Sequence, residues 1–220
     1  MRHFDDIYAI AAERKGGANA LEAMLTDPVP PRELAGLPED RWLAQLTKSV
    51  FQAGFNWKVI EAKWDGFEAA FHGFDIDRNA MMNDDTFDTL LKDERVVRNG
   101  AKIQAVRDNA VFLSGLRDQG GAGTVLGGWP STDYIGLLDL LKKDGSRLGG
   151  ATSQYAMRFI GRDGWILSQD VVTRLIAEGI VDKAPTSKGA MKAVQTAFNT
   201  WMEQSDRGLT QISRVLAMSL

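Results

Sequence analysis

The stretch LGGATSQYAMRFIGRDGWILSQDVV, Leu148 to Val172, decides the fold of this chain. Gly149 and Gly150 permit a tight turn between two helices, because glycine adopts backbone conformations that other residues avoid. The N–H groups that open the following helix are then free to hold an anion such as a phosphate. A further helix capped by Ser168 would place Asp170 in its first turn, where the helix dipole favours an ionised carboxylate. These features predict a binding turn and a catalytic carboxylate, although each also has a purely structural explanation, as a loop and as a dipole complement.

Positive charge gathers around this stretch, although the net charge of the chain is −3. Asp144 is the only acidic residue between Lys142 and Arg162, and that segment contains five basic residues: Lys142, Lys143, Arg147, Arg158 and Arg162. Local basic charge favours a phosphate as the anion of the glycine hairpin. The alternative is a solvated helix face without a ligand.

The apolar spacing along the chain is helical almost throughout, and strand patterns are nearly absent. Expected helices cover residues 4–14, 18–25, 101–117 and 132–143, with others beginning near residues 38 and 170 and two more at the C-terminal end. We therefore expect an all-α fold of packed, non-parallel helices, a single domain over 1–220 with lobes at about 1–120 and 129–220. A loose glycine-rich loop, Gln119 to Gly128, is expected to separate the lobes, with a cleft between them.

Composition excludes several kinds of chemistry. The chain has no cysteine, and therefore no disulfide, thiolate nucleophile or cysteine-ligated metal. Its two histidines, His3 and His72, are far apart in sequence, so we expect neither a metal site nor a cofactor. No run of 18 apolar residues is present, and the charged start MRHFDDIYAIAAER does not resemble a signal peptide. We expect a cytoplasmic protein that does not bind a membrane.

Three ordered blocks of sequence carry a resemblance to a known family. FQAGFNWKVIEAKWDGFEAAFHGFD, Phe51 to Asp75, and VVRNGAKIQAVRDNAVFL, Val96 to Leu113, resemble two blocks of the 3-methyladenine DNA glycosylase I family. The third block, GGATSQYAMRF, resembles the segment that forms the family's helix-hairpin-helix motif. The resemblance runs from about Phe51 to Arg174 and implies a helix-hairpin-helix DNA glycosylase fold.

The resemblance implies a pocket for a base flipped out of the duplex, at a cost of a few kcal/mol that is least for a damaged base. Trp57 matches the tryptophan that stacks on the base, and a cationic purine over its ring would gain about 0.5–2 kcal/mol. Gln52 is expected to probe the base or the strand. Gly54 and Phe55 match the loop that enters the gap left by the base, with Phe55 as the wedge. For Trp57 the alternative is ordinary core packing.

The resemblance also implies roles for the opening stretch. Five of its residues are expected to bind DNA phosphate: Gly149, Gly150, Ala151, Thr152 and Gln154. Gln154 also stands where related enzymes that cut the strand carry a lysine nucleophile, so we expect base excision by water alone. Asp170 aligns with the superfamily's catalytic aspartate, which stabilises the developing sugar cation and orients water.

Two departures from the family pattern are informative. Ser49 stands in place of the family's base-recognition glutamate, and a neutral hydroxyl does not attract a cationic purine as a carboxylate does. The family's N-terminal motifs and zinc site have no counterpart in MRHFDDIYAIAAERKGG. We expect the C-terminal segment, from Thr186 onward, to hold the termini by packing instead. The chain therefore resembles a divergent branch of the family.

The sequence leads to one main hypothesis and two alternatives. The main hypothesis is a monofunctional DNA glycosylase that excises alkylated or otherwise damaged purines, of the 3-methyladenine type, in base excision repair. Its partner would be double-stranded DNA containing a damaged base, and a monomer would suffice. The first alternative is a non-catalytic helix-hairpin-helix DNA-binding protein derived from a glycosylase, favoured by Ser49. The second is an all-α structural protein with no nucleic-acid role, which leaves the three ordered blocks unexplained.

Overall fold

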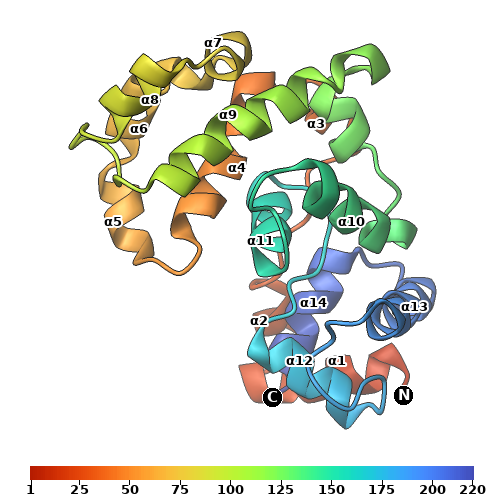
Figure 1. The fold of residues 1–220 in the computed structure, drawn as a ribbon. Helices are drawn as coiled ribbons and strands as arrows, with labels where there is room; N and C mark the ends of the chain where they lie inside the picture. The colour runs from red at the N-terminus through yellow and green to blue at the C-terminus, as the bar shows by residue number, and fades with distance from the viewer. The chain divides into compact units, whose positions relative to one another are not determined.

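The computed structural model describes residues 1–220, and its regular structure is entirely helical (Figure 1). The prediction of an all-α fold is confirmed. Contacts divide the chain into two compact units. Unit 1 comprises Met1–Val29, Pro130–Gly136 and Gly161–Leu220, and unit 2 comprises Pro30–Trp129 and Leu137–Ile160.

These units differ from lobes at 1–120 and 129–220, because each is assembled from separate stretches of chain. The first helices pack against the last two, where Trp201 Nε1 donates to the carbonyl oxygen of Arg2 at 3.2 Å and Gln204 Oε1 accepts from Phe4 N at 2.9 Å. The hairpin helix that follows Gly150 packs instead on the helix Glu39–Gln52, and both of these helices belong to unit 2. Packing between segments distant in sequence therefore decides the division.

Unit 1 is built around buried aromatic side chains. The ring centroid of Trp165 lies 4.8 Å from those of Tyr134 and Phe198. The ring centroid of Phe198 lies 5.6 Å from that of Trp201. The carboxylate of Asp163 accepts from the backbone N–H groups of residues 209 and 210 and so caps the last helix. The helical elements of unit 1 are α1 (Phe4–Lys15), α2 (Ala18–Glu22), η4 (Ser131–Asp133), the start of α10 (Tyr134–Asp144), α12 (Gln169–Ala177), α13 (Lys188–Ser205) and α14 (Leu209–Met218).

Unit 2 has its core between α4 and α9, which lie side by side (Figure 1). A run of stacked rings, Trp64, Phe67, Phe71 and Phe74, joins α6 to η1, which packs on α4. The helical elements of unit 2 are α3 (Pro31–Ala35), α4 (Glu39–Gln52), α5 (Trp57–Ala62), α6 (Trp64–Ala70), η1 (His72–Phe74), α7 (Ile76–Ala80), α8 (Asp84–Leu90), α9 (Gly100–Ser114), η2 (Arg117–Gln119), η3 (Gly123–Gly127), the rest of α10 and α11 (Ala151–Phe159).

The prediction of a loose loop at Gln119 to Gly128 is wrong. This segment forms the short 3-10 helix η2 and the π-helical turn η3, which packs on α3. Gly123 and Gly127 are buried there, and a Cβ at Gly127 would lie 2.7 Å from the Cβ of Leu34. The glycines therefore allow a close approach of backbones, which sequence alone does not distinguish from loop flexibility.

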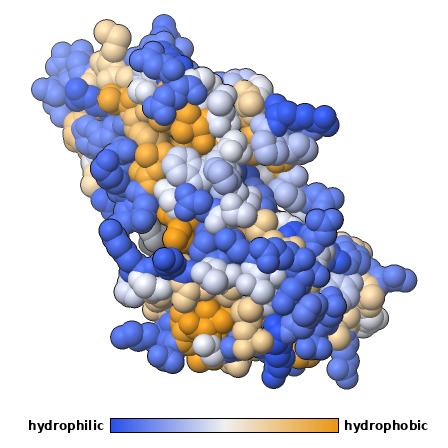
Figure 2. Space-filling view, turned by 90° about the vertical axis from the view of Figure 1, so that its right-hand side faces the viewer, coloured by the Kyte–Doolittle hydropathy of each residue, from blue (hydrophilic) through white to orange (hydrophobic).

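Most large apolar side chains are buried. The face in Figure 2 accordingly shows mainly hydrophilic residues, interrupted by separate hydrophobic patches. None of the helices combines the length and the apolar character that a membrane-spanning segment needs.

Candidate functional site

The end of α4 is shaped by its local sequence and by one buried lysine. The helix ends at Gln52, and Gly54 follows with a φ of 66°, in the left-handed region that favours glycine. Asn56 then caps α5 by accepting from Lys58 N at 3.0 Å. The ammonium group of Lys102, on α9, donates to the carbonyl oxygens of Phe51 at 3.0 Å and Ala53 at 2.8 Å. Positive charge at a helix C-terminus is favourable, so Lys102 fixes the turn that presents the next residues.

A pocket of about 280 Å³ opens beside this turn, entirely within unit 2. Ser49, Gln52, Ala53 and Gly54 line it from the α4 side, Trp57 from α5, and Ala151, Thr152 and Tyr155 from α11. The structure thus brings together all three expected base-pocket residues, one residue of the expected wedge loop and two of the expected phosphate contacts. No charged side chain lines this pocket.

Aromatic rings form an exposed group at the pocket. Trp57 is 39% exposed. Its ring packs edge to face on the rings of Tyr155 and Phe159, with centroid distances of 5.2 Å and 5.7 Å. Phe55, on the turn before α5, is 44% exposed. Trp57 is therefore not an ordinary core tryptophan, and its position suits contact with a planar ligand. Tyr155 was not predicted as a pocket residue, although its position one turn after Ala151 was a signal for it.

The hairpin before α11 has the predicted glycine turn. Gly150 has φ 59° and ψ −131°, a conformation suited to glycine, and α11 begins at the next residue. Asn109, on α9, anchors the loop by donating to the carbonyl oxygen of Ser146 at 3.1 Å and accepting from its N–H at 2.7 Å. The first N–H groups of α11, from Ala151 and Thr152, have no partner within the helix. They remain suited to an anion, whereas Gln154 is buried.

A polar network lies behind the pocket. Gln45 Nε2 donates to Ser49 Oγ at 3.1 Å, and Gln52 Nε2 donates to Glu61 Oε1 at 3.0 Å. Lys48 Nζ forms an ion pair with Glu61 Oε2 at 2.8 Å. A second hollow of about 260 Å³ lies here, lined by Gln45, Lys48, Gln52, Trp57, Glu61 and Phe159. Sequence reasoning missed Glu61 because only the packing of α5 on α4 brings it to Gln52.

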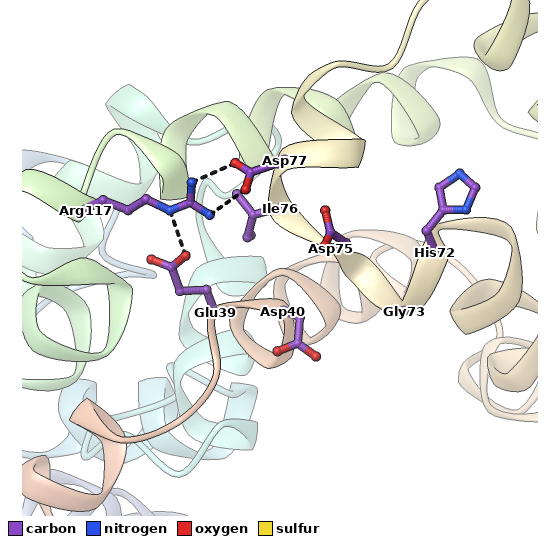
Figure 3. A pocket seen from close by; sticks show the side chains of 8 residues that line it. All are labelled: Glu39, Asp40, His72, Gly73, Asp75, Ile76, Asp77 and Arg117. Atoms are coloured by element: carbon purple, nitrogen blue, oxygen red, sulfur yellow. Dashed lines mark hydrogen bonds and ion pairs between the residues drawn. The ribbon is translucent and has the colours of Figure 1, made fainter.

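An acidic pocket elsewhere in unit 2 has a structural explanation (Figure 3). Arg117 donates to Glu39 at 2.9 Å and to Asp77 at 2.7 Å, and Figure 3 shows its guanidinium between the two carboxylates. The hydrogen bonds that Arg117 donates to the carboxylates of Asp77 and Glu39 raise the pKa of Arg117 above its usual value. The arginine thus joins α4 to α7, and the structure contains no group of three or more His, Cys, Asp or Glu residues placed to hold a metal.

Asp170 lies in unit 1, in the first turn of α12. Ser168 caps this helix as predicted, with Oγ accepting from Val171 N at 3.3 Å, and the Asp170 carboxylate is exposed. The expected cleft and the catalytic role of Asp170 stay predictions.

The helical units and the glycine hairpin define a protein with the fold of helix-hairpin-helix DNA glycosylases. A crystal structure of the Methanocaldococcus jannaschii 8-oxoguanine glycosylase/lyase, in complex with DNA containing 8-oxoguanine, has this fold with a TM-score of 0.53. The match covers 96% of this chain and 94% of that one at 11% sequence identity. A variant of Staphylococcus aureus 3-methyladenine DNA glycosylase I matches with a TM-score of 0.51 at 20% identity, over 56% of this chain and 77% of that one.

Sequence comparison finds a likeness over part of the chain. Residues 36–124 match the methyladenine glycosylase family. DNA-3-methyladenine glycosylase 1 of Escherichia coli is 36% identical over 59 residues, which are 27% of this chain and 32% of that enzyme. These matches confirm the resemblance to the 3-methyladenine DNA glycosylase I family, and the first two sequence blocks lie inside the matched segment. The chain matches only about a third of the length of the E. coli enzyme.

Proposed function

We propose that this chain is a monofunctional DNA glycosylase that removes alkylated or otherwise damaged purines by base flipping and hydrolysis of the glycosidic bond. The observation that carries the proposal is the pocket beside the end of α4, which collects Ser49, Gln52 and Trp57 with the start of α11. A planar base would stack on the exposed ring of Trp57. The partner would be duplex DNA containing a damaged base, bound by a monomer in the cytoplasm.

The hairpin supplies the second half of the proposal. The N–H groups of Ala151 and Thr152 would hold a phosphate near the lesion, with Gly149 and Gly150 shaping the approach. Phosphate contacts fix the register of the protein on DNA without reading sequence. Phe55 would fill the gap in the duplex, because its ring is exposed on the turn before α5.

Water would attack the sugar directly in this mechanism. Gln154 replaces the amine nucleophile of related lyases, so no covalent Schiff base would form and the strand would stay intact. Asp170 would stabilise the oxocarbenium-like sugar and orient the water.

An excision assay on alkylated duplex DNA tests the proposal. The wild type should release a free modified base and leave an uncut strand, with no adduct trapped by borohydride. The Asp170→Asn and Trp57→Ala variants should release the base at least about tenfold more slowly. Tight, salt-dependent DNA binding without any base release would instead favour a non-catalytic DNA-binding protein, the alternative that the neutral residue Ser49 supports.

A separate variant tests the hairpin. Gly150→Val places a β-branched side chain at φ 59°, ψ −131°, a backbone conformation that only glycine adopts without strain. We expect DNA affinity to fall at least about tenfold, together with the salt dependence of binding. Unchanged affinity and unchanged salt dependence would remove the hairpin from the binding site.

A further inference from the structure

The base pocket lacks a carboxylate at the position expected from the family. The carboxylate of Glu61 lies nearby, in contact with the pocket residue Gln52. Ser49, at that position, is 4% exposed and neutral. Gln52 is equally buried, and its Nε2 donates to Glu61 Oε1 at 3.0 Å. Glu61 does not line the base pocket itself, so its influence on a bound base would pass through Gln52.

The chemistry of this contact fixes the direction of the Gln52 amide. An ionised carboxylate only accepts hydrogen bonds, so Gln52 must turn its NH₂ group toward Glu61. The side-chain oxygen Oε1 of Gln52 is then left to accept a hydrogen bond from a ligand, whereas the backbone carbonyl oxygen of Gln52 accepts from Phe55 N at 3.0 Å. Ser49 Oγ accepts from Gln45 Nε2, which leaves the hydroxyl proton of Ser49 available. The pocket thereby offers an acceptor on Gln52 and a donor on Ser49.

Lys48 completes the arrangement. Its ammonium group lies 2.8 Å from Glu61 Oε2, so the two charges offset one another. The pocket therefore has fixed hydrogen-bonding groups but little net charge. Such a site suits a neutral purine that presents an acceptor and a donor on one edge, and it provides little attraction for a cationic purine beyond the ring of Trp57.

We propose that Glu61 is a positioning residue for base specificity, which orients Gln52 so that the pocket selects a neutral purine lesion by hydrogen bonds. This inference rests on the proposed function. Lys48 offsets the charge of Glu61 and thereby keeps the pocket from preferring a cation.

The test compares excision of a neutral purine lesion and a cationic, N-alkylated one, each in the same duplex. Glu61→Gln frees the Gln52 amide to rotate and leaves Lys48 unpaired, so excision of the cationic lesion should fall roughly tenfold and KM for the neutral lesion should rise about threefold. Lys48→Met leaves Glu61 unpaired, so the ratio of cationic to neutral excision should rise about threefold or more. Glu94→Gln is the matched control, because Glu94 belongs to the same unit and its exposed side chain forms no ion pair.

Opposite shifts of this ratio in the two variants support the inference, because a merely structural role would slow both lesions together. Equal ratios in wild type, Glu61→Gln and Lys48→Met would overturn it. Circular dichroism melting of each variant verifies folding before the comparison.

A binding measurement separates this inference from the proposed function. Titration calorimetry with a neutral N-methylated adenine and with the corresponding permanently cationic dimethyladeninium needs no bond cleavage. Wild type should bind the neutral base at least as tightly as the cation, and Lys48→Met should shift the preference toward the cation. Wild-type preference for the cation of tenfold or more would overturn the inference. Absence of base release, with the predicted binding preferences intact, would count against the proposed function alone.

Discussion

At the scale of single residues, exposure distinguishes the candidate base-pocket tryptophan from the tryptophans of the core. Trp42, Trp165 and Trp201 are fully buried, whereas Trp57 is 39% exposed and lines a pocket. An aromatic ring that is partly exposed to water contributes less hydrophobic stabilisation than a buried one. A planar ligand that covers the ring would add the missing part to the free energy of binding.

Truncation of Trp57 should therefore affect binding more than folding. We expect Trp57→Ala to weaken binding of a purine base by about 1–3 kcal/mol, the usual value of stacking on an aromatic ring. Phe55→Ala is the matched variant, because that ring is also exposed but lies outside the pocket lining. It should weaken binding to lesion-containing duplex while leaving the affinity for the free base unchanged. Calorimetry on both ligands checks the pair, and equal losses of base affinity in the two variants would contradict the assignment.

The residues of the candidate site were predictable only in part. Ser49, Gln52, Gly54 and Trp57 lie within nine consecutive positions, so a motif resemblance was enough to find them. Glu61 and Lys102 reach the site from other helices, and each resembles an ordinary surface charge in the sequence. Their roles depend on which helix faces cross in space, which local patterns do not encode.

At the scale of helical elements, the capping residue Ser168 explains why the start of α12 followed from sequence, and two further helices begin at caps that were not predicted. Asn56, Ser168 and Ser187 each accept a backbone N–H with their side chains where a helix begins. The turn η3 had no such signal, because glycines that allow two backbones to pack closely have the same sequence pattern as a flexible loop. Local chemistry predicts where a helix starts, whereas close packing depends on the partner.

The junction between α4 and α5 depends on Lys102. Burial, followed by the neighbouring charge of Arg147, lowers the pKa of the Lys102 ammonium, yet two carbonyl oxygens hold it in place. Lys102→Met would leave these carbonyls without their charged donor, and we expect the free energy of unfolding to fall by about 1–3 kcal/mol. Lys92→Met, at an exposed lysine of the same unit, should leave it unchanged.

Urea denaturation measures that change, and base affinity shows whether the turn has moved. A loss of base affinity larger than that of the control is expected, because Gly54 and Trp57 follow the residues that Lys102 holds. Full stability in Lys102→Met would show that water replaces the ammonium at no cost.

At the scale of the whole molecule, the chain builds each unit from segments far apart in sequence. Unit 1 contains both the first and the last helices, so its stability depends on contacts that close long loops. One such contact joins α1, α2 and the connection before α14: Arg207 pairs with Glu22 at 2.6 Å, and Tyr8 donates to the same carboxylate at 2.6 Å.

This cluster should make the stability of unit 1 depend on pH at both extremes. Hydrogen bonds from Arg207 and Tyr8 lower the pKa of the Glu22 carboxyl from its ordinary 4.5, so its contribution is present above that value and is lost as the pH falls through the lowered pKa. The hydrogen bond to Glu22 raises the pKa of Tyr8 from 10.0, so that contribution is present below 10.0 and is lost as the pH rises through the raised pKa. Glu22→Gln removes both effects. The difference in melting temperature between wild type and Glu22→Gln should therefore be constant between these values and shrink beyond them in both directions. A calorimetric pH series on both proteins measures it, and a difference independent of pH would show that the cluster contributes by packing alone.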